Sequence, residues 1–320
     1  MTLTTDPKPA AAPYGELRAR LDTLSTEAYR PELAEIDRLS TLDIIRAMNT
    51  EDALVPAALG AVAPQLARAV DAVVERMRRG GRLIHVGAGT AGRMGVLDSA
   101  ECPPTFNTEP GQVVGVIAGG LDAMLGAVEG AEDDPAGAVA ALRELGLTAD
   151  DVVVGISASG RTPFALGAVR HARELGALTI GLACNEGSEL GEAADIPLEV
   201  VVGPEFLTGS TRLKAGTAQK LTLNTLSTVV MIRLGKTYGN LMVDVRASNE
   251  KLRARSRRIV ALATGADPDT IEEALTGTGG EVKNAILVIL GSVDAPTAAR
   301  LLAAHDGHLR EALRAAPAAP

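Results

Sequence analysis

Short apolar runs alternate with amphipathic segments through the middle of the chain. Each run is rich in Val, Ile or Leu and is bounded by glycine or polar residues, which is typical of buried parallel strands. Segments with apolar positions at helical spacing lie between most of the runs. The predicted strands cover residues 82–87, 112–120, 152–157, 177–184 and 196–203. Strands that alternate with helices indicate right-handed crossovers, and therefore an α/β fold with a doubly wound, mostly parallel sheet.

Both ends of the chain are predicted to be helical. Residues 1–15 are the exception, because their Pro, Ala and Thr content predicts disorder. Individual helices are predicted over residues 57–79, 163–175 and 213–236. The chain is therefore divided into three parts, which are a disordered tail with N-terminal helices (1–64), an α/β domain (65–248) and a small C-terminal helical domain (249–320).

The composition sets limits on the core and on the partners. Hydrophobic residues make up 46% of the chain but aromatic residues only 2%, so that Ala, Val, Leu and Ile must form the core. So few aromatic rings argue against a platform for single-stranded nucleic acid. The net charge of -9 makes the chain a poor ligand for phosphate polymers or anionic membranes. We therefore expect neither nucleic acid nor a membrane as a partner.

The cysteines and the N-terminal residues indicate the compartment. Cys102 and Cys184 suggest no disulfide framework, and no Cys/His spacing is that of a zinc site. The first residues have no apolar signal-peptide region, and no apolar run approaches the ~20 residues of a membrane span. We expect a cytoplasmic protein without a metal site.

A hydroxyl-rich loop, SASGRTP, follows the third predicted strand and begins a helix. Loops of this kind are candidate ligand sites because ligands bind outside the carboxyl ends of parallel strands. Ser157, Ser159 and Thr162 offer three hydroxyl groups, and Gly160 allows close approach to the backbone. With the free amides of the helix start they could hold a phosphate group. A helix N-cap with a polar turn is the alternative interpretation.

A glycine-rich loop, GAGTAGRMG, follows the first predicted strand. Gly87, Gly89 and Gly92 match the G-x-G-x-x-G pattern of dinucleotide sites. The acidic residue expected after the next strand is missing, because that segment ends in glycines. A tight turn around a small ligand is therefore favoured over a dinucleotide site.

Two acidic segments carry further candidates. Glu101 and Cys102 precede Pro103 and Pro104, which are predicted to end a helix and to leave Glu101 in its last turn. An acidic residue in the last turn is unfavourable with the helix dipole, which indicates a functional role for Glu101. The alternative interpretation is that Glu101 is an exposed surface residue. Cys102 is predicted to be a buried small residue. The run VEGAEDDP at 128–135, taken alone, is typical of a solvated loop.

Several of these strings together resemble one family. GAGTAGRMGVLDSAECPPTF is very similar to the signature of the N-acetylmuramic acid 6-phosphate etherases. The strings EGAED, ISASGRTPF, VVGPEFLTGSTRLKAGTAQK and NLMVDVRASNEKL match further family segments in the same order. The resemblance runs from about Thr26 to the last predicted helices. It implies a sugar isomerase-like, phosphosugar-binding sandwich over residues 65–248.

The resemblance also implies roles for particular residues. Glu101 matches the family's principal acid/base glutamate, and Glu132 matches its second catalytic carboxylate. The residues implied to bind the sugar and its phosphate are Gly89, Thr90, Arg93, Ser157, Ser159, Gly160 and Thr162. Two departures stand out. Ala91 replaces a usual Ser beside the sugar, and the segment TEAYRP lacks the family's usual Asn.

The implied reaction is cleavage of the lactyl ether of N-acetylmuramic acid 6-phosphate, by elimination and then hydration. This reaction requires acid/base groups and no cofactor. The resemblance also implies that the protein is a homodimer and that it binds a small phosphosugar as its substrate.

Two alternative functions remain. The first is an aldose-ketose isomerase, against which the ECPP and GSTRLKAGTAQK segments argue. The second is a non-catalytic regulator that senses sugar phosphates; residues 1–64 hold 6 Lys/Arg against 10 Asp/Glu, which is unsuited to DNA.

Overall fold

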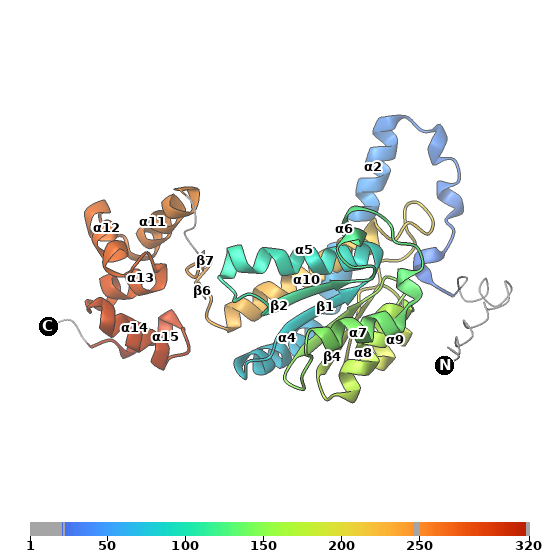
Figure 1. Cartoon of the computed structure of the whole chain (residues 1–320). Helices are drawn as coiled ribbons and strands as arrows, with labels where there is room; N and C mark the ends of the chain where they lie inside the picture. The colour runs from blue at the N-terminus through green and yellow to red at the C-terminus, as the bar shows by residue number, and fades with distance from the viewer. Residues whose placement is uncertain (1–20, 22, 246–249, 318–320) are drawn as a thin grey trace, which may run out of the picture.

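The computed structural model describes residue 21, residues 23–245 and residues 250–317 (Figure 1). The segment 1–15, for which the sequence predicts disorder, lies outside these described residues. The described chain comprises an N-terminal arm of short helices, a central α/β domain and a group of C-terminal helices, as Figure 1 shows.

Five parallel strands form the central sheet, in the order β2-β1-β3-β4-β5. The five predicted strands are confirmed, each somewhat shorter than its apolar run. Their bounds are β1 Leu83–Gly87, β2 Val113–Ile117, β3 Val152–Ile156, β4 Leu178–Ala183 and β5 Ile196–Glu199. Gly87 pairs with Ile117 on one side and with Ile156 on the other, so that β1, β2 and β3 end level with one another. The loops that follow these strands therefore start from the same edge of the sheet.

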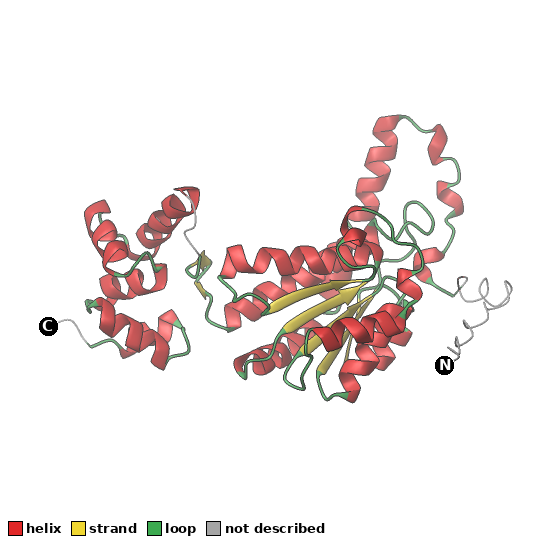
Figure 2. Cartoon of the chain, in the orientation of Figure 1, coloured by secondary structure: helices red, strands yellow, loops and turns green. Residues whose placement is uncertain are grey.

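Helices cover both faces of the sheet, so the predicted α/β fold class is confirmed (Figure 2). One face carries α4 Ala63–Arg78, α5 Gly89–Phe106 and α10 Lys214–Arg233. The other carries α7 Pro135–Glu144, α8 Pro163–Glu174 and α9 Glu189–Ala193. The aliphatic residues of β1 and β3 are fully buried between these layers, which explains why these strands lack a polar alternation.

The predicted single helix over 57–79 is in fact two helices. α3 covers Val55–Ala61, and α4 begins after a break at Val62. Pro64 lies in the first turn of α4. Because proline lacks an N–H group and disfavours helical geometry in the residue before it, the chain restarts the helix there instead of continuing it.

The prediction that Pro103 and Pro104 end the helix of Glu101 is wrong. α5 continues through both prolines to Phe106 and ends at Asn107, whose φ of 50° is left-handed and whose N–H donates to the Pro103 carbonyl. Cys102 and Phe106, one helical turn apart, are both buried in the core. Their burial holds this segment helical despite the missing donors of the prolines.

The N-terminal arm is attached to α10 by a buried ion pair. It consists of η1 Ser25–Glu27, η2 Pro31–Leu33, η3 Ile36–Arg38 and α2 Thr41–Asp52. Glu51 accepts from Lys214 Nζ at 2.9 Å and pairs with Arg30 at 2.6 Å. The Lys214 side chain is 2% exposed and that of Glu51 13% exposed. The pKa of Glu51 is lowered, chiefly by the hydrogen bond from Arg30 and further by Lys214, despite the cost of burial.

Replacing Glu51 by Gln should strongly destabilise the protein. The substitution removes the ion-pair partner of the buried Lys214 ammonium, and breaking a buried pair in this way typically costs about 3–5 kcal/mol. Because the folded pKa of Glu51 is lowered, its contribution should be complete above the unfolded pKa and lost as the pH falls through the folded value. Urea unfolding at neutral and acid pH measures both effects. Glu35→Gln is the control, since Glu35 pairs with Arg38 while 69% exposed; equal losses in the two variants would contradict the interpretation.

The C-terminal part has its own core. A hairpin of β6 Thr237–Tyr238 and β7 Leu241–Met242 precedes it. The helices are α11 Glu250–Thr264, α12 Pro268–Gly277, α13 Val282–Gly291, α14 Ala295–Ala304 and α15 Leu309–Ala315. Val243, Ile286 and Leu309 are among the residues buried together there. Figure 1 shows these helices grouped at the end of the molecule opposite the N-terminal arm.

Within the described residues, no single helix is long and apolar enough to cross a bilayer. Two bent helix pairs meet that test of length and composition when each pair is joined. They are Thr41–Ala61 with Ala63–Arg78, bent by 60°, and Val282–Gly291 with Ala295–Ala304, bent by 107°.

Candidate active site

The hydroxyl-rich loop after β3 gathers three side chains at one point. Ser157 Oγ lies 2.8 Å from Thr162 Oγ1 and 3.3 Å from Ser159 Oγ. Ser157 also accepts from the Gly160 amide at 3.0 Å. Thr162 precedes α8, yet its side chain makes no capping bond to the helix amides. The hydroxyl group is therefore not used as an N-cap, and the positive end of α8 stays available to an anion.

Gly160 adopts a conformation that suits glycine alone. Its φ is +70°, and a Cβ atom there would lie 2.4 Å from the Cβ of Ser188. The sequence predicts close approach at Gly160, and the structure shows that the approaching group is the chain at Ser188. Gly160 thus fixes the shape of the hydroxyl loop from behind.

The glycine-rich loop after β1 is a tight connection between strand and helix. A Cβ atom on Gly92 would lie 2.6 Å from the Gly87 carbonyl oxygen, so the first turn of α5 packs directly on the end of β1. Gly89 has a φ of +52° and begins α5. These glycines serve close packing, and they bring Gly89 and Thr90 to the edge of a cavity.

A cavity of about 280 Å³ lies between these two loops. The residues with hydroxyl groups that line it are Thr90, Ser157, Ser159, Thr162 and Thr211. Two carboxylates and one amide, those of Glu27, Glu132 and Gln219, also line it. The cavity thus joins a phosphate-sized cluster of hydroxyl groups to acid/base side chains, at the carboxyl edge of the sheet where ligands bind in this type of fold.

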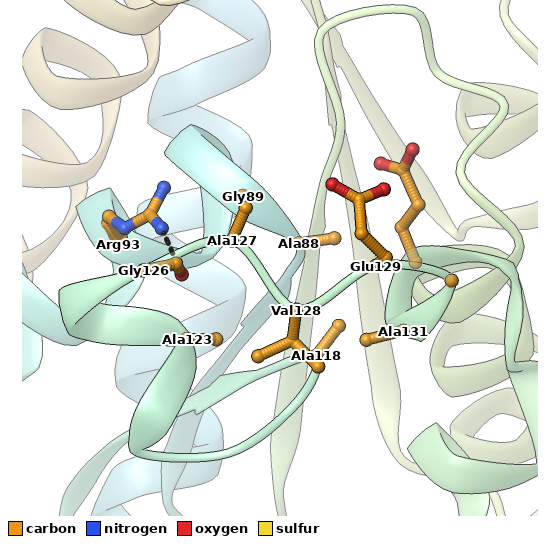
Figure 3. A pocket seen from close by; sticks show the side chains of 12 residues that line it. Ala88, Gly89, Arg93, Ala118, Ala123, Gly126, Ala127, Val128, Glu129 and Ala131 are labelled. Atoms are coloured by element: carbon orange, nitrogen blue, oxygen red, sulfur yellow. Dashed lines mark hydrogen bonds between the residues drawn. The ribbon is translucent and has the colours of Figure 1, made fainter.

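A second cavity of about 190 Å³ adjoins the first, and Figure 3 shows side chains that line it. Gly89 and Glu132 line both cavities. Glu132 is an exposed residue on the short helix η4 Ala131–Asp133. Arg93 lies on the wall of the second cavity and donates to the Gly126 carbonyl at 2.9 Å, the bond drawn as a dashed line in Figure 3. Arg93 therefore ties the first turns of α5 to the loop that leads to Glu132.

Glu101 is not brought to these cavities within one chain. It is exposed on α5, twelve residues after Gly89. At 1.5 Å per residue that places it about 18 Å along the helix axis, towards the amino edge of the sheet. Seven of the nine candidate site residues therefore line the cavities. Gly160 shapes the hydroxyl loop from behind, and Glu101 lies apart.

Sequence reasoning missed three polar residues that line the larger cavity, which are Glu27, Thr211 and Gln219. Thr211 and Gln219 lie in the VVGPEFLTGSTRLKAGTAQK segment, where the family resemblance was the available signal. Glu27 reaches the cavity because its neighbours are anchored. The Ser25 amide donates to Asn185 Oδ1 at 2.8 Å, and Asn185 Nδ2 donates to the hydroxyl oxygen of the buried Thr26 at 3.1 Å.

Both cysteines are buried and chemically quiet. Cys102 is 2% exposed, and burial, assisted by Asp98, raises the pKa of its thiol to about 12. Burial likewise raises the pKa of Cys184 to about 12. A thiol with such a pKa is neutral and unreactive at pH 7, which confirms that Cys102 is a small buried residue.

Comparison with known proteins first defines the class. The family model of the SIS domain matches residues 139–229, and that of the glucokinase regulatory protein N-terminal SIS domain matches residues 65–173. A solved phosphoheptose isomerase from Francisella tularensis is similar at a TM-score of 0.47 and 21% identity, covering 61% of this chain and 100% of that one.

Two curated relatives then identify the family. An N-acetylmuramic acid 6-phosphate etherase from Streptomyces coelicolor is 72% identical over 95% of this chain and 97% of its own. One from Rubrobacter xylanophilus is 60% identical over 92% of this chain and 97% of its own. The two matched SIS-domain models together span residues 65–229. The chain belongs to the N-acetylmuramic acid 6-phosphate etherase family.

Proposed function

We propose that this protein cleaves the lactyl ether of N-acetylmuramic acid 6-phosphate, giving N-acetylglucosamine 6-phosphate and D-lactate. The observation that carries the proposal is the larger cavity, where three converging hydroxyl groups face the Glu132 carboxylate in a chain 72% identical to a named etherase. The activity belongs to the recycling of cell-wall amino sugars.

The hydroxyl loop is our proposed phosphate site. Ser157, Ser159 and Thr162 supply hydroxyl donors, and the start of α8 supplies free amides and the positive end of its dipole. With the phosphate held there, the sugar extends towards Thr90 and Glu132 on the same cavity wall. This arrangement supports residues 65–248 as the phosphosugar-binding domain, followed by a helical domain over 249–320.

The reaction needs proton transfer at two positions of the open-chain sugar. The C1 aldehyde acidifies the C2 hydrogen, which a carboxylate removes. The C2–C3 double bond forms as the C3–O bond breaks, and a carboxylic acid protonates the departing lactate oxygen. Water then adds its hydroxyl to C3 and a proton returns to C2. We assign these transfers to Glu132 and Glu101, because side-chain carboxyl groups can perform them without a cofactor.

The distance of Glu101 from Gly89 requires a second copy of the chain. An exposed carboxylate about 18 Å along α5 from the cavity cannot reach a ligand held in its own subunit. We therefore propose a homodimer in which the Glu101 side chain of one copy completes the cavity of the other. A closed twofold arrangement would complete both sites at once.

The two alternative functions give different products. An aldose-ketose isomerase would interconvert sugar phosphates without releasing lactate, and a sensor would bind its ligand unchanged. The curated relatives at 72% and 60% identity favour the etherase over both. We place the enzyme in the cytoplasm, with a small phosphosugar and neither nucleic acid nor a membrane as its partner; the two unpaired, buried cysteines support a reducing compartment.

Incubation with N-acetylmuramic acid 6-phosphate is the direct test. We expect equal amounts of D-lactate and N-acetylglucosamine 6-phosphate, measured by an enzymatic lactate assay and by mass spectrometry. In H₂¹⁸O the label should enter the sugar at C3 and not the lactate, because water adds to the unsaturated aldehyde. Binding of the substrate without lactate release would overturn the proposed function.

A further inference from the structure

Gln219 is a buried amide on the wall of the larger cavity. It lies on α10, is 1% exposed and lines the cavity together with the hydroxyl loop. Its Nε2 atom is buried and has no hydrogen-bond partner among the residues that the structure describes. An amide N–H group buried without an acceptor destabilises the protein, so such a group calls for an explanation.

Neighbouring polar side chains of α10 have hydrogen-bond partners. Thr217 Oγ1 donates to the Leu213 carbonyl at 2.9 Å, and Thr222 Oγ1 donates to the Ala218 carbonyl at 2.7 Å. Asn224 Nδ2 donates to Asp98 at 2.7 Å. Gln219 lies between these satisfied residues and differs from them in lining the cavity.

The packing of α10 fixes where Gln219 stands. Gly216, three residues earlier on the same face, has no Cβ; one would lie 3.2 Å from Thr90 Cγ2. Glu205, which is completely buried, accepts from the amides of Lys214 and Ala215 at 2.9 Å each and thereby holds the start of α10. Gln219 therefore stands on a well-anchored helix, at the cavity that the hydroxyl loop also lines.

We propose that Gln219 is a substrate-binding residue that donates an amide hydrogen bond to an oxygen of the bound sugar. This inference rests on the proposed function, because the sugar phosphate is the ligand. Gln219 lines the cavity of the hydroxyl loop but not the one lined by Arg93. We assign its acceptor to the phosphate-anchored sugar, the part of the ligand that N-acetylglucosamine 6-phosphate retains. The covered atom is the nitrogen, so donation requires a half-turn of the terminal amide. That rotation turns the nitrogen to the cavity and leaves the oxygen in the covered position, where a missing partner is tolerated better than it is for an N–H group.

The test compares two ligands on the full-length protein. In Gln219→Met, binding of N-acetylglucosamine 6-phosphate should weaken about 3- to 10-fold, as expected for one hydrogen bond, while binding of inorganic phosphate stays unchanged. In Ser159→Ala both ligands should bind more weakly. Gln65→Met is the matched control, because Gln65 also has an unpaired buried amide atom but lies on α4 outside the cavity. It should leave the binding of both ligands unchanged.

Calorimetric titration and thermal unfolding separate the outcomes. A Gln219→Met protein that binds the sugar phosphate like wild type overturns the proposal. Equal weakening of both ligands also overturns it, since that is the signature of a distorted cavity. If the Met variant does not fold, Gln219→Leu, which is neutral and also removes the amide, should show the same selective loss. Wild-type protein that binds the sugar phosphate but releases no lactate would sink the proposed function and leave this inference standing.

Discussion

Replacing Glu132 by Gln should reduce turnover about 10²–10⁴-fold, the usual contribution of a general acid or base. Glu132 is exposed on η4 and lines both cavities, so the nearly isosteric amide should leave the fold intact. The amide neither accepts nor supplies a proton. Steady-state assay of D-lactate measures the loss, and thermal unfolding checks the fold.

Exchange of the C2 hydrogen with deuterated solvent tells which step is lost. A variant without the base cannot exchange C2, whereas one that lacks only the acid for lactate departure still can. Asp133→Asn is the control, because Asp133 is the next residue of η4 but lines neither cavity. Glu132→Gln with wild-type turnover, or an equal loss in both variants, would remove Glu132 from the mechanism.

The sheet could be predicted from sequence because parallel strands buried on both faces form continuous apolar runs. β1 and β3 show this directly. Helix ends were harder. The rule that prolines end helices failed at Pro103, where the burial of Cys102 and Phe106 outweighs the local preference. A tertiary contact of this kind leaves no local mark in the sequence.

The candidate site likewise contains residues that the local sequence predicts and residues that only tertiary contacts place. The hydroxyl and glycine loops could be predicted because each follows a strand, and the ends of β1 and β3 are level in the sheet. Glu27 and Gln219 could not, because they reach the cavity from the N-terminal arm and from α10. Their positions depend on distant contacts, such as Ser25 with Asn185 and Glu51 with Lys214.

Glu101→Gln should also cost about 10²–10⁴-fold in turnover, although Glu101 lies far from the cavity of its own chain. The expected loss follows from the proposed dimer, in which the residue serves the partner's site. Because Glu101 is exposed, its replacement should leave thermal unfolding unchanged. Glu174→Gln, an exposed glutamate at the end of α8, is the control and should keep full turnover.

Mixing subunits distinguishes a role in the partner's site from a role in the same chain. When the inactive Glu101→Gln and Glu132→Gln proteins are unfolded and refolded together, about half of the dimers should be mixed, each with one intact site, which gives about one quarter of wild-type activity. Such recovery is impossible if both carboxylates act within one chain, because neither parent supplies an intact chain. If mixed dimers are shown to form but no activity is recovered, both glutamates act within one subunit. That result would contradict the proposal that Glu101 completes the cavity of the partner. Full activity of Glu101→Gln alone would instead show that Glu132 acts without it, and the reason for a second copy would disappear.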